Sequence, residues 1–347
     1  MRTGRGRYTE VMTTRGGWRY AGISILIFIL PLSAGAQSFG SYAMPAAAEY
    51  SITVSPQFPS PFSTAILTFL SNNLDLANAS LTVAAGGKQL YHGDVRSVSI
   101  PLGGGGVPVN VSTTITQNGQ AYPQTVTIIP QDVSLVLEPL SSAPPLYLGK
   151  PLVPLGGQTR LVAVADLRTA SGKPLNPADL SYLWTVDGTH IANASGIGKD
   201  ALVVGSPLQY RDLSVSVSVE SPDGTLAGSA DETLTPVAPT LRIYENDPLR
   251  GIRFSHALSG SFAITSAEAS LYAAPFSFPT TQGAPSLTWF LNGSAAQSGG
   301  VLTLRPTGAG KGSANVSATA SSGVLGADAA QGLTLTFGQD TSSLFGL

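Results

Sequence analysis

The chain has 347 residues and no cysteine; 43% of its residues are hydrophobic and 11% are charged. Without cysteine, disulfide frameworks, thiolate zinc sites, iron–sulfur clusters and cysteine nucleophiles are all excluded. Five arginines and one glutamate give residues 1–36 a net charge of +4, so the rest carries −6 of the total of −2. An acidic remainder with no basic stripe argues against nucleic-acid binding.

The N-terminal segment reads as an export signal. Residues 1–20 are basic, residues 23–30 read ISILIFIL, and residues 33–36 are small (SAGA). This order of basic region, short apolar core and small-residue cleavage site is typical of a secretory signal peptide. We therefore expect a signal peptide over residues 1–36 and a mature chain that begins at Gln37.

An uncleaved membrane anchor over residues 18–36 is the alternative interpretation. That stretch is barely long enough to span a bilayer, and Pro31 weakens it as a helix. In both interpretations the rest of the chain lies outside the cytoplasm and meets a membrane only through this segment. Residues 37–48 are small and irregular, and we expect a tether.

A strand followed by a tight turn recurs at a spacing near one hundred residues. The copies are Leu81–Gly87 (LTVAAGG), Tyr182–Gly188 (YLWTVDG) and Ser286–Gly293 (SLTWFLNG). Trp184 and Trp289 lie 105 residues apart, and Val83 takes the tryptophan position 101 residues before Trp184. This spacing is the size of one immunoglobulin-like sandwich, whereas helical solenoids repeat at less than half that length.

Turn chemistry and alternation both predict strands. Asp187-Gly188 and Asn292-Gly293 suit the positive φ angles of tight hairpin turns. Residues 213–219 (LSVSVSV) alternate strictly between apolar and polar. The first repeat alone offers about seven short strands between residues 51 and 129, and no stretch after residue 40 predicts a long helix.

The sequence therefore predicts an all-β chain of three tandem immunoglobulin-like, PKD-like β-sandwiches after the signal sequence. Their predicted bounds are residues 49–130, 131–238 and 239–338, followed by a tail over residues 339–347. Prolines mark both domain edges, so we expect semi-rigid joints. Three such units in a row predict a rod on the order of 100 Å.

The stretches from Trp184 to Gly188 (WTVDG) and from Trp289 to Gly293 (WFLNG) resemble Ig-like and PKD-like domains of exported bacterial surface proteins. The resemblance covers residues 49–338. It implies that Trp184, Trp289 and Val83 are core residues and that the protein serves adhesion, assembly or spacing. It carries no catalytic residue and no cofactor.

No motif in the chain predicts catalysis. His92, His190 and His256 fall one per repeat and form no ligand pair at metal spacing, and there is no Gly-x-Ser-x-Gly elbow. An enzyme with a dispersed site is the alternative. Glu245 and Asp247 are weak calcium candidates, since a hard cation needs six to eight oxygens; the alternative there is a solvated turn.

Two aromatic stretches are candidate contact loops. Tyr147 follows two prolines, and Tyr272, Phe276 and Phe278 precede the third repeat's tryptophan strand. Exposed, these rings would contact sugar or protein; the alternative is that they fill the end of a sandwich or a joint between domains. Residues 103–106 (GGGG) are predicted to be a mobile hairpin loop.

These observations predict a non-enzymatic, exported structural or adhesive surface protein, a rod-like spacer that could belong to a pilus or secretion assembly. Its expected partners are other surface or pilus proteins, or cell-surface glycans. A carbohydrate- or calcium-binding extracellular module is the alternative function.

Overall fold

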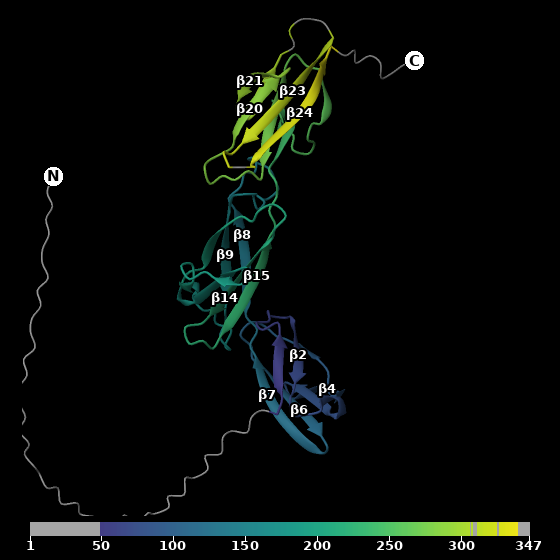
Figure 1. Cartoon of the computed structure of the whole chain (residues 1–347), viewed down its shortest axis with the longest axis vertical. Coiled ribbons are helices and arrows are strands. Elements are labelled where there is room, and N and C mark those ends of the chain that lie inside the picture. Colours follow the sequence, from purple (N-terminus) through teal and green to yellow (C-terminus); the bar gives the residue numbers. More distant parts are fainter. Residues whose placement is uncertain (1–48, 306, 308–310, 325, 339–347) are drawn as a thin grey trace, which may run out of the picture. The chain divides into compact units, whose positions relative to one another are not determined.

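The computed structural model describes residues 49–305, 307, 311–324 and 326–338 (Figure 1). The predicted signal peptide (1–36), tether (37–48) and tail (339–347) lie outside these residues. The regular secondary structure of this part of the chain is almost entirely β-strand, with two short 3-10 helices at Leu76–Asn78 and Pro177–Asp179. In this part of the chain no helix has the length and apolarity that a membrane span requires.

The first sandwich packs a sheet of order β1-β2-β5 against a sheet of order β4-β3-β6-β7. Its strands are β1 (Ser51–Ser55), β2 (Thr64–Leu70), β3 (Ser80–Ala85), β4 (Lys88–Asp94), β5 (Val98–Pro101), β6 (Val109–Gln117) and β7 (Gln120–Ile128). Counted along the chain, strands one, two and five form one sheet, and strands four, three, six and seven form the other. This arrangement of two antiparallel sheets is an immunoglobulin-like sandwich.

The second sandwich repeats this topology, with sheets β8-β9-β13 and β11-β10-β14-β15 and the short β12 paired to β10. Its strands are β8 (Asp132–Pro139), β9 (Gln158–Asp166), β10 (Ser181–Val186), β11 (Thr189–His190), β12 (Gly196–Ile197), β13 (Ala201–Gly205), β14 (Leu213–Glu220) and β15 (Ala227–Leu234). Period-two alternation determines which face is buried. In β14 the side chains of Val215, Val217 and Val219 are fully buried, and the intervening serines lie on the other face.

The third sandwich has sheets β17-β16-β19-β22 and β18-β24-β23-β20-β21. Its strands are β16 (Thr240–Asp247), β17 (Gly251–Ile252), β18 (Gly260–Ile264), β19 (Ala269–Phe276), β20 (Ser286–Leu291), β21 (Ser294–Ser298), β22 (Val301–Leu304), β23 (Gly312–Ser321) and β24 (Asp328–Phe337). The short β18 pairs in parallel with β24, which adds a strand to the edge of the second sheet. The prediction of an all-β chain of tandem immunoglobulin-like sandwiches is confirmed.

The two tryptophans lie at matching places in the second and third sandwiches. Both side chains are fully buried. The Trp184 indole N–H donates to the carbonyl of Lys199 at 2.9 Å, and that of Trp289 donates to the carbonyl of Gly299 at 3.0 Å. Val83, at the equivalent place on β3, is also fully buried in the first core, so a smaller apolar side chain occupies that position.

The turn after each tryptophan strand is held in the same way. Asp187 and Asn292 have φ angles of 45° and 51°, and the glycines after them, Gly188 and Gly293, have 75° and 85°. Two successive positive φ angles define the hairpin turn that suits twisted strands. The Oδ1 atom of Asp187 accepts from the Ser214 N–H, and that of Asn292 accepts from the Asn315 N–H, both at 2.9 Å. Each turn is thereby fastened to the next strand of its sheet.

Candidate interaction surfaces

The structure does not bring the three histidines together. His92 lies on β4, His190 on β11 and His256 in the loop after β17, so each belongs to a different sandwich, and all three are exposed. His92 shares a 2.9 Å hydrogen bond with the Thr82 hydroxyl of the neighbouring strand. Within the described residues no three histidine or carboxylate side chains gather in a way that could hold a metal ion.

The two calcium candidates sit at the end of β16, where their oxygens already have partners. Glu245 forms an ion pair with Arg253 at 3.0 Å. The Oδ1 atom of Asp247 accepts from the N–H groups of Leu249 at 2.8 Å and Arg250 at 3.0 Å, and these bonds hold the pKa of Asp247 below its usual value. The carboxylate caps the turn between β16 and β17, which gives it a structural role without a cation.

The glycine run of residues 103–106 ends in a tight contact. Gly106 has φ +79°, and its N–H donates to the Pro130 carbonyl at 2.8 Å. A Cβ atom at this position would overlap the carbonyl oxygens of Arg168 and Thr169 in the second sandwich. The prediction of a hairpin loop over residues 103–106 is wrong, because the flanking strands β5 and β6 belong to different sheets. At Gly106 only glycine allows the two backbones to approach this closely.

Gln131 lies at this first joint, defined here as the contacts of Pro59 and Gly106 in the first sandwich with Gln131, Arg168 and Thr169 in the second. Its backbone N–H donates to the Pro59 carbonyl at 3.2 Å. Its side chain is 2% exposed. The amide nitrogen donates to the Arg168 carbonyl at 3.0 Å, and the amide oxygen accepts from the Arg168 N–H at 2.7 Å. Both ends of a buried amide are thus paired, as burial of a polar group requires.

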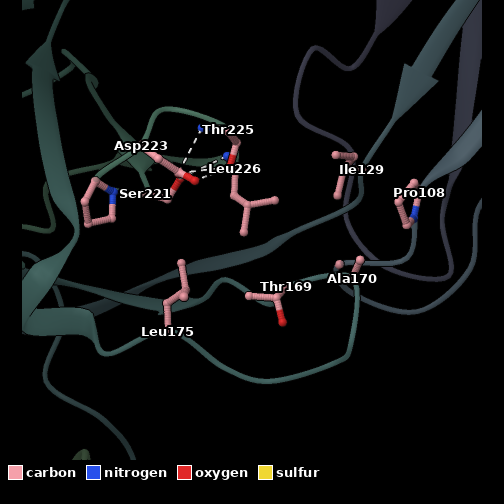
Figure 2. Close-up of a pocket in the computed structure, with 11 residues that line it drawn as sticks. Pro108, Ile129, Thr169, Ala170, Leu175, Ser221, Asp223, Thr225 and Leu226 are labelled. Atoms are coloured by element: carbon pink, nitrogen blue, oxygen red, sulfur yellow. Dashed lines mark hydrogen bonds between the residues drawn. The ribbon is translucent and has the colours of Figure 1, made fainter.

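A pocket of about 510 Å³ opens beside the first joint, and Figure 2 shows its walls. Ile129, Leu175 and Leu226 contribute apolar side chains, and Asp223 is the only ionisable residue that lines it. The Asp223 carboxylate accepts from the hydroxyls of Ser221 at 2.5 Å and Thr225 at 2.9 Å, and these hydrogen bonds lower its pKa. The carboxylate fastens its own turn, so the pocket offers a ligand little directional polar contact.

A second joint is formed by residues 140–142 against residues 275–280 of the third sandwich. The Ser142 hydroxyl donates to the Pro275 carbonyl at 3.0 Å and accepts from the Phe278 N–H at 3.0 Å. The Ser142 backbone pairs on both sides, donating to the Phe278 carbonyl at 2.8 Å and accepting from the Ser277 N–H at 2.9 Å. Residues from two sandwiches thus share a short strand-like ladder.

Three of the four predicted contact aromatics meet at this second joint. The Tyr147 ring makes edge-to-face contacts with Phe276 at 5.0 Å and with Phe254 at 5.8 Å between centroids. Phe254 also contacts Tyr244 at 5.1 Å and Tyr272 at 6.3 Å. We call these five residues the aromatic cluster. Burial raises the pKa of both Tyr244 and Tyr272 above the usual tyrosine value.

Phe278 does not belong to the surface at all. Its side chain is fully buried in the third core, which rules out the predicted role as an exposed contact. Tyr244 and Phe254, by contrast, were not among the sequence candidates. On β16, Tyr244 occupies the face opposite the core residues Leu241 and Ile243, so period two alone would have directed it to solvent.

Comparison with known proteins gives a likeness of fold only. No family model matches the chain, and no curated protein does. Among solved structures, the central fibronectin-III array of RIM-binding protein aligns with 82% of this chain and 95% of its own at 10% identity and a TM-score of 0.29. Four immunoglobulin domains of Sidekick-1 align with 83% of this chain and 74% of their own at 14% identity and a TM-score of 0.21.

Three N-terminal domains of the bacteriophage RB49 outer capsid protein Hoc align with 84% of this chain and 99% of their own, at 13% identity and a TM-score of 0.23. At TM-scores this low the likeness carries no argument about function. The PKD-like subfamily and the bacterial origin stay predictions.

Proposed function

We propose that this chain is an exported, non-enzymatic surface protein whose consecutive immunoglobulin-like sandwiches act as a spacer and present contact surfaces. The observation that carries the proposal is the construction of the two joints. Each is closed by hydrogen bonds between neighbouring sandwiches: the Gln131 N–H donates to the Pro59 carbonyl at 3.2 Å in the first joint, and the Ser142 hydroxyl bonds to Pro275 and Phe278 in the second. A spacer needs such joints, since domains connected by free linkers move relative to one another by default.

The hydrogen bonds of Gln131 favour a closed first joint. Its side-chain amide is held within the second sandwich by two bonds to the backbone of Arg168. This fixes the position of its backbone N–H, which donates to the Pro59 carbonyl of the first sandwich at 3.2 Å. A typical net hydrogen bond contributes about 0.5–1.5 kcal/mol, and loosening the joint would lose this one.

Export is supported by the order of basic, apolar and small residues in the first 36 positions. Once outside the cytoplasm, a cysteine-free chain depends on packing alone, and three separate hydrophobic cores provide that packing. The partners that suit this role are other surface or pilus proteins, or cell-surface glycans.

Protease treatment of intact cells tests the export half of the proposal. We expect the full chain, expressed in a bacterial host, to be digested from outside and to yield a mature N-terminus at Gln37. A matched variant that lacks residues 1–36 should stay protected in the cytoplasm. Recovery of the full chain from the cytoplasm with Met1 intact would contradict the proposal.

Small-angle scattering of the protein that begins at Gln37 tests the spacer half. Three units of about 100 residues held in series predict a maximum dimension on the order of 100 Å. A compact particle would contradict the spacer role while leaving the export result unaffected.

A further inference from the structure

The second joint carries a second feature, a pocket of about 250 Å³ beside the aromatic cluster. Tyr147 and Lys150 line it from the second sandwich, and Arg242, Tyr244 and Phe276 line it from the third. We propose that this pocket binds an anionic sugar unit, such as a uronic acid residue of a polysaccharide. The proposal goes beyond the spacer role and does not depend on it.

The third sandwich builds one wall from a single face of its sheet. Thr240, Arg242 and Tyr244 alternate along β16 on the face opposite the core residues Leu241 and Ile243. In the register of β16 with β19, Phe276 lies directly opposite Thr240. The equivalent strand of the second sandwich is β8, which carries Ser134, Val136 and Glu138 on the face opposite its core residue Val133. That face of β8 has neither an aromatic residue nor a cation.

The second sandwich builds the other wall. Tyr147 covers the cluster through its contacts with Phe276 and Phe254, yet 38% of its surface remains exposed. A partly exposed tyrosine ring offers an apolar face for a sugar's C–H groups and a hydroxyl at its tip. The hydrogen bonds of Ser142 to Pro275 and Phe278 connect the two walls. The pocket is thus formed before any ligand arrives, as small-molecule sites usually are.

Charge identifies the ligand as an anion. Lys150 and Arg242 are both exposed, and in the described part of the chain neither makes an ion pair or a side-chain hydrogen bond. No carboxylate lines the pocket. The chain beyond residue 36 has a net charge of −6. Two unpaired cations in one small pocket therefore make this site positive in an otherwise acidic protein. A carboxylate ligand would satisfy both, in part through charge-assisted hydrogen bonds.

The aromatic rings distinguish a sugar from a simple anion. Inorganic phosphate would use Lys150 and Arg242 and leave the Tyr147 ring unused. A uronic acid places a carboxylate, hydroxyls and an apolar ring face in one compact unit. The hydroxyls of Thr240 and Ser277, which also line the pocket, can hydrogen-bond to sugar hydroxyls. This match of all three chemistries favours the sugar.

Isothermal titration of the protein that begins at Gln37 with tetragalacturonic acid tests the proposal. We expect saturable binding that weakens as salt is raised. The fully methyl-esterified tetramer keeps the rings and loses the charge, and it should bind at least about tenfold more weakly, since charge-assisted bonds are the strong ones. Inorganic phosphate should bind more weakly than the acidic tetramer.

Variants locate the site. Arg242→Gln and Lys150→Gln should each weaken binding of the acidic tetramer by about fivefold to tenfold, as loss of one exposed hydrogen-bonding partner does. The matched control Lys88→Gln removes an exposed cation of β4 in the first sandwich and should leave binding unchanged. Circular dichroism melting of each variant verifies that the fold is intact.

Several results would overturn the proposal. They are absence of binding, equal binding of the methyl ester, equal binding of phosphate, or no effect of Arg242→Gln. Tighter binding of a tetraglutamate peptide than of the acidic tetramer would also overturn it, by assigning the pocket to an acidic protein segment. Because none of these results bears on export or on particle length, failure here is distinguishable from failure of the spacer role.

Discussion

Truncation of Trp184 is the most direct test of how each sandwich is stabilised. The side chain is fully buried on β10, directly opposite Val217 of β14. Its indole N–H donates to the Lys199 carbonyl at 2.9 Å. Trp184→Ala removes both the packing and the hydrogen bond, whereas Trp184→Phe removes the donor and part of the indole volume but keeps an aromatic ring in the core.

The two variants should differ in size of effect. Replacing a buried tryptophan with alanine costs about 3–5 kcal/mol. Loss of the donor alone leaves the Lys199 carbonyl unpaired, at a cost of about 1–3 kcal/mol. Because domains are stable by only about 5–15 kcal/mol, the alanine variant should lose a large share of the second sandwich's stability, and the phenylalanine variant clearly less.

Urea unfolding of the protein that begins at Gln37 measures both effects. Trp184 and Trp289 are the only tryptophans after residue 36. In Trp184→Ala, fluorescence therefore reports the third sandwich through Trp289, while circular dichroism reports all three. We expect a transition in circular dichroism to move to lower urea while the Trp289 midpoint changes much less, because the two tryptophans belong to separate cores.

The reciprocal variant, Trp289→Ala, should lower the third sandwich's transition and leave the Trp184 signal nearly unchanged. If Trp184→Ala leaves circular dichroism unfolding unaltered, the indole does not anchor the core. If the Trp289 midpoint falls as far as the circular dichroism transition, the sandwiches unfold as one cooperative unit and the separate-core reasoning is refuted.

Three further predictions concern turns and joints. Gly106→Ala should destabilise the first joint by about 1–3 kcal/mol, since strain and overpacking each cost that much, and should speed proteolysis near the joint. Gly103→Ala is the control, because Gly103 has open space around it. Equal proteolysis rates for the two variants would contradict the contact at Gly106. Asn292→Ala should lower the third sandwich's stability by about 1–2 kcal/mol, because alanine lacks both the side-chain acceptor and the tolerance of positive φ, whereas Asn292→Asp should stay near wild type in thermal melts. Asp223 has a folded-state pKa below its unfolded value. Its contribution to stability is therefore present above the unfolded pKa and is lost as the pH falls through the folded pKa. The stability advantage of wild type over Asp223→Asn, measured by urea unfolding, should shrink below about pH 4, and a difference independent of pH would refute the capping role.

The elements that could be read from the sequence are those governed by local rules. Valines alternating with serines in β14 predict a strand with one buried face, because side chains alternate with period two. Asp187-Gly188 and Asn292-Gly293 predict hairpin turns, since few other residue pairs accept two positive φ angles. Repetition of this strand and turn about every hundred residues then points to tandem sandwiches.

The joints and the pocket could not be read in this way, because they unite residues far apart in the chain. Ser142 and Phe278 are hydrogen-bonded across 136 positions, and no periodicity relates them. Gly106 belongs to a glycine run that the sequence predicts to be a loop, but the backbone of Arg168 and Thr169 packs against it.

Burial of the aromatic residues likewise depended on tertiary contact. Tyr244 lies on the face of β16 that alternation assigns to solvent, yet it is 6% exposed because Phe254 and other parts of the chain cover it. Phe278 looked similar to Phe276 in the sequence, but only Phe278 enters the core. Alternation along a strand determines which side chains share a face. Which face is covered depends on the segments that pack against it, and only the tertiary structure decides this.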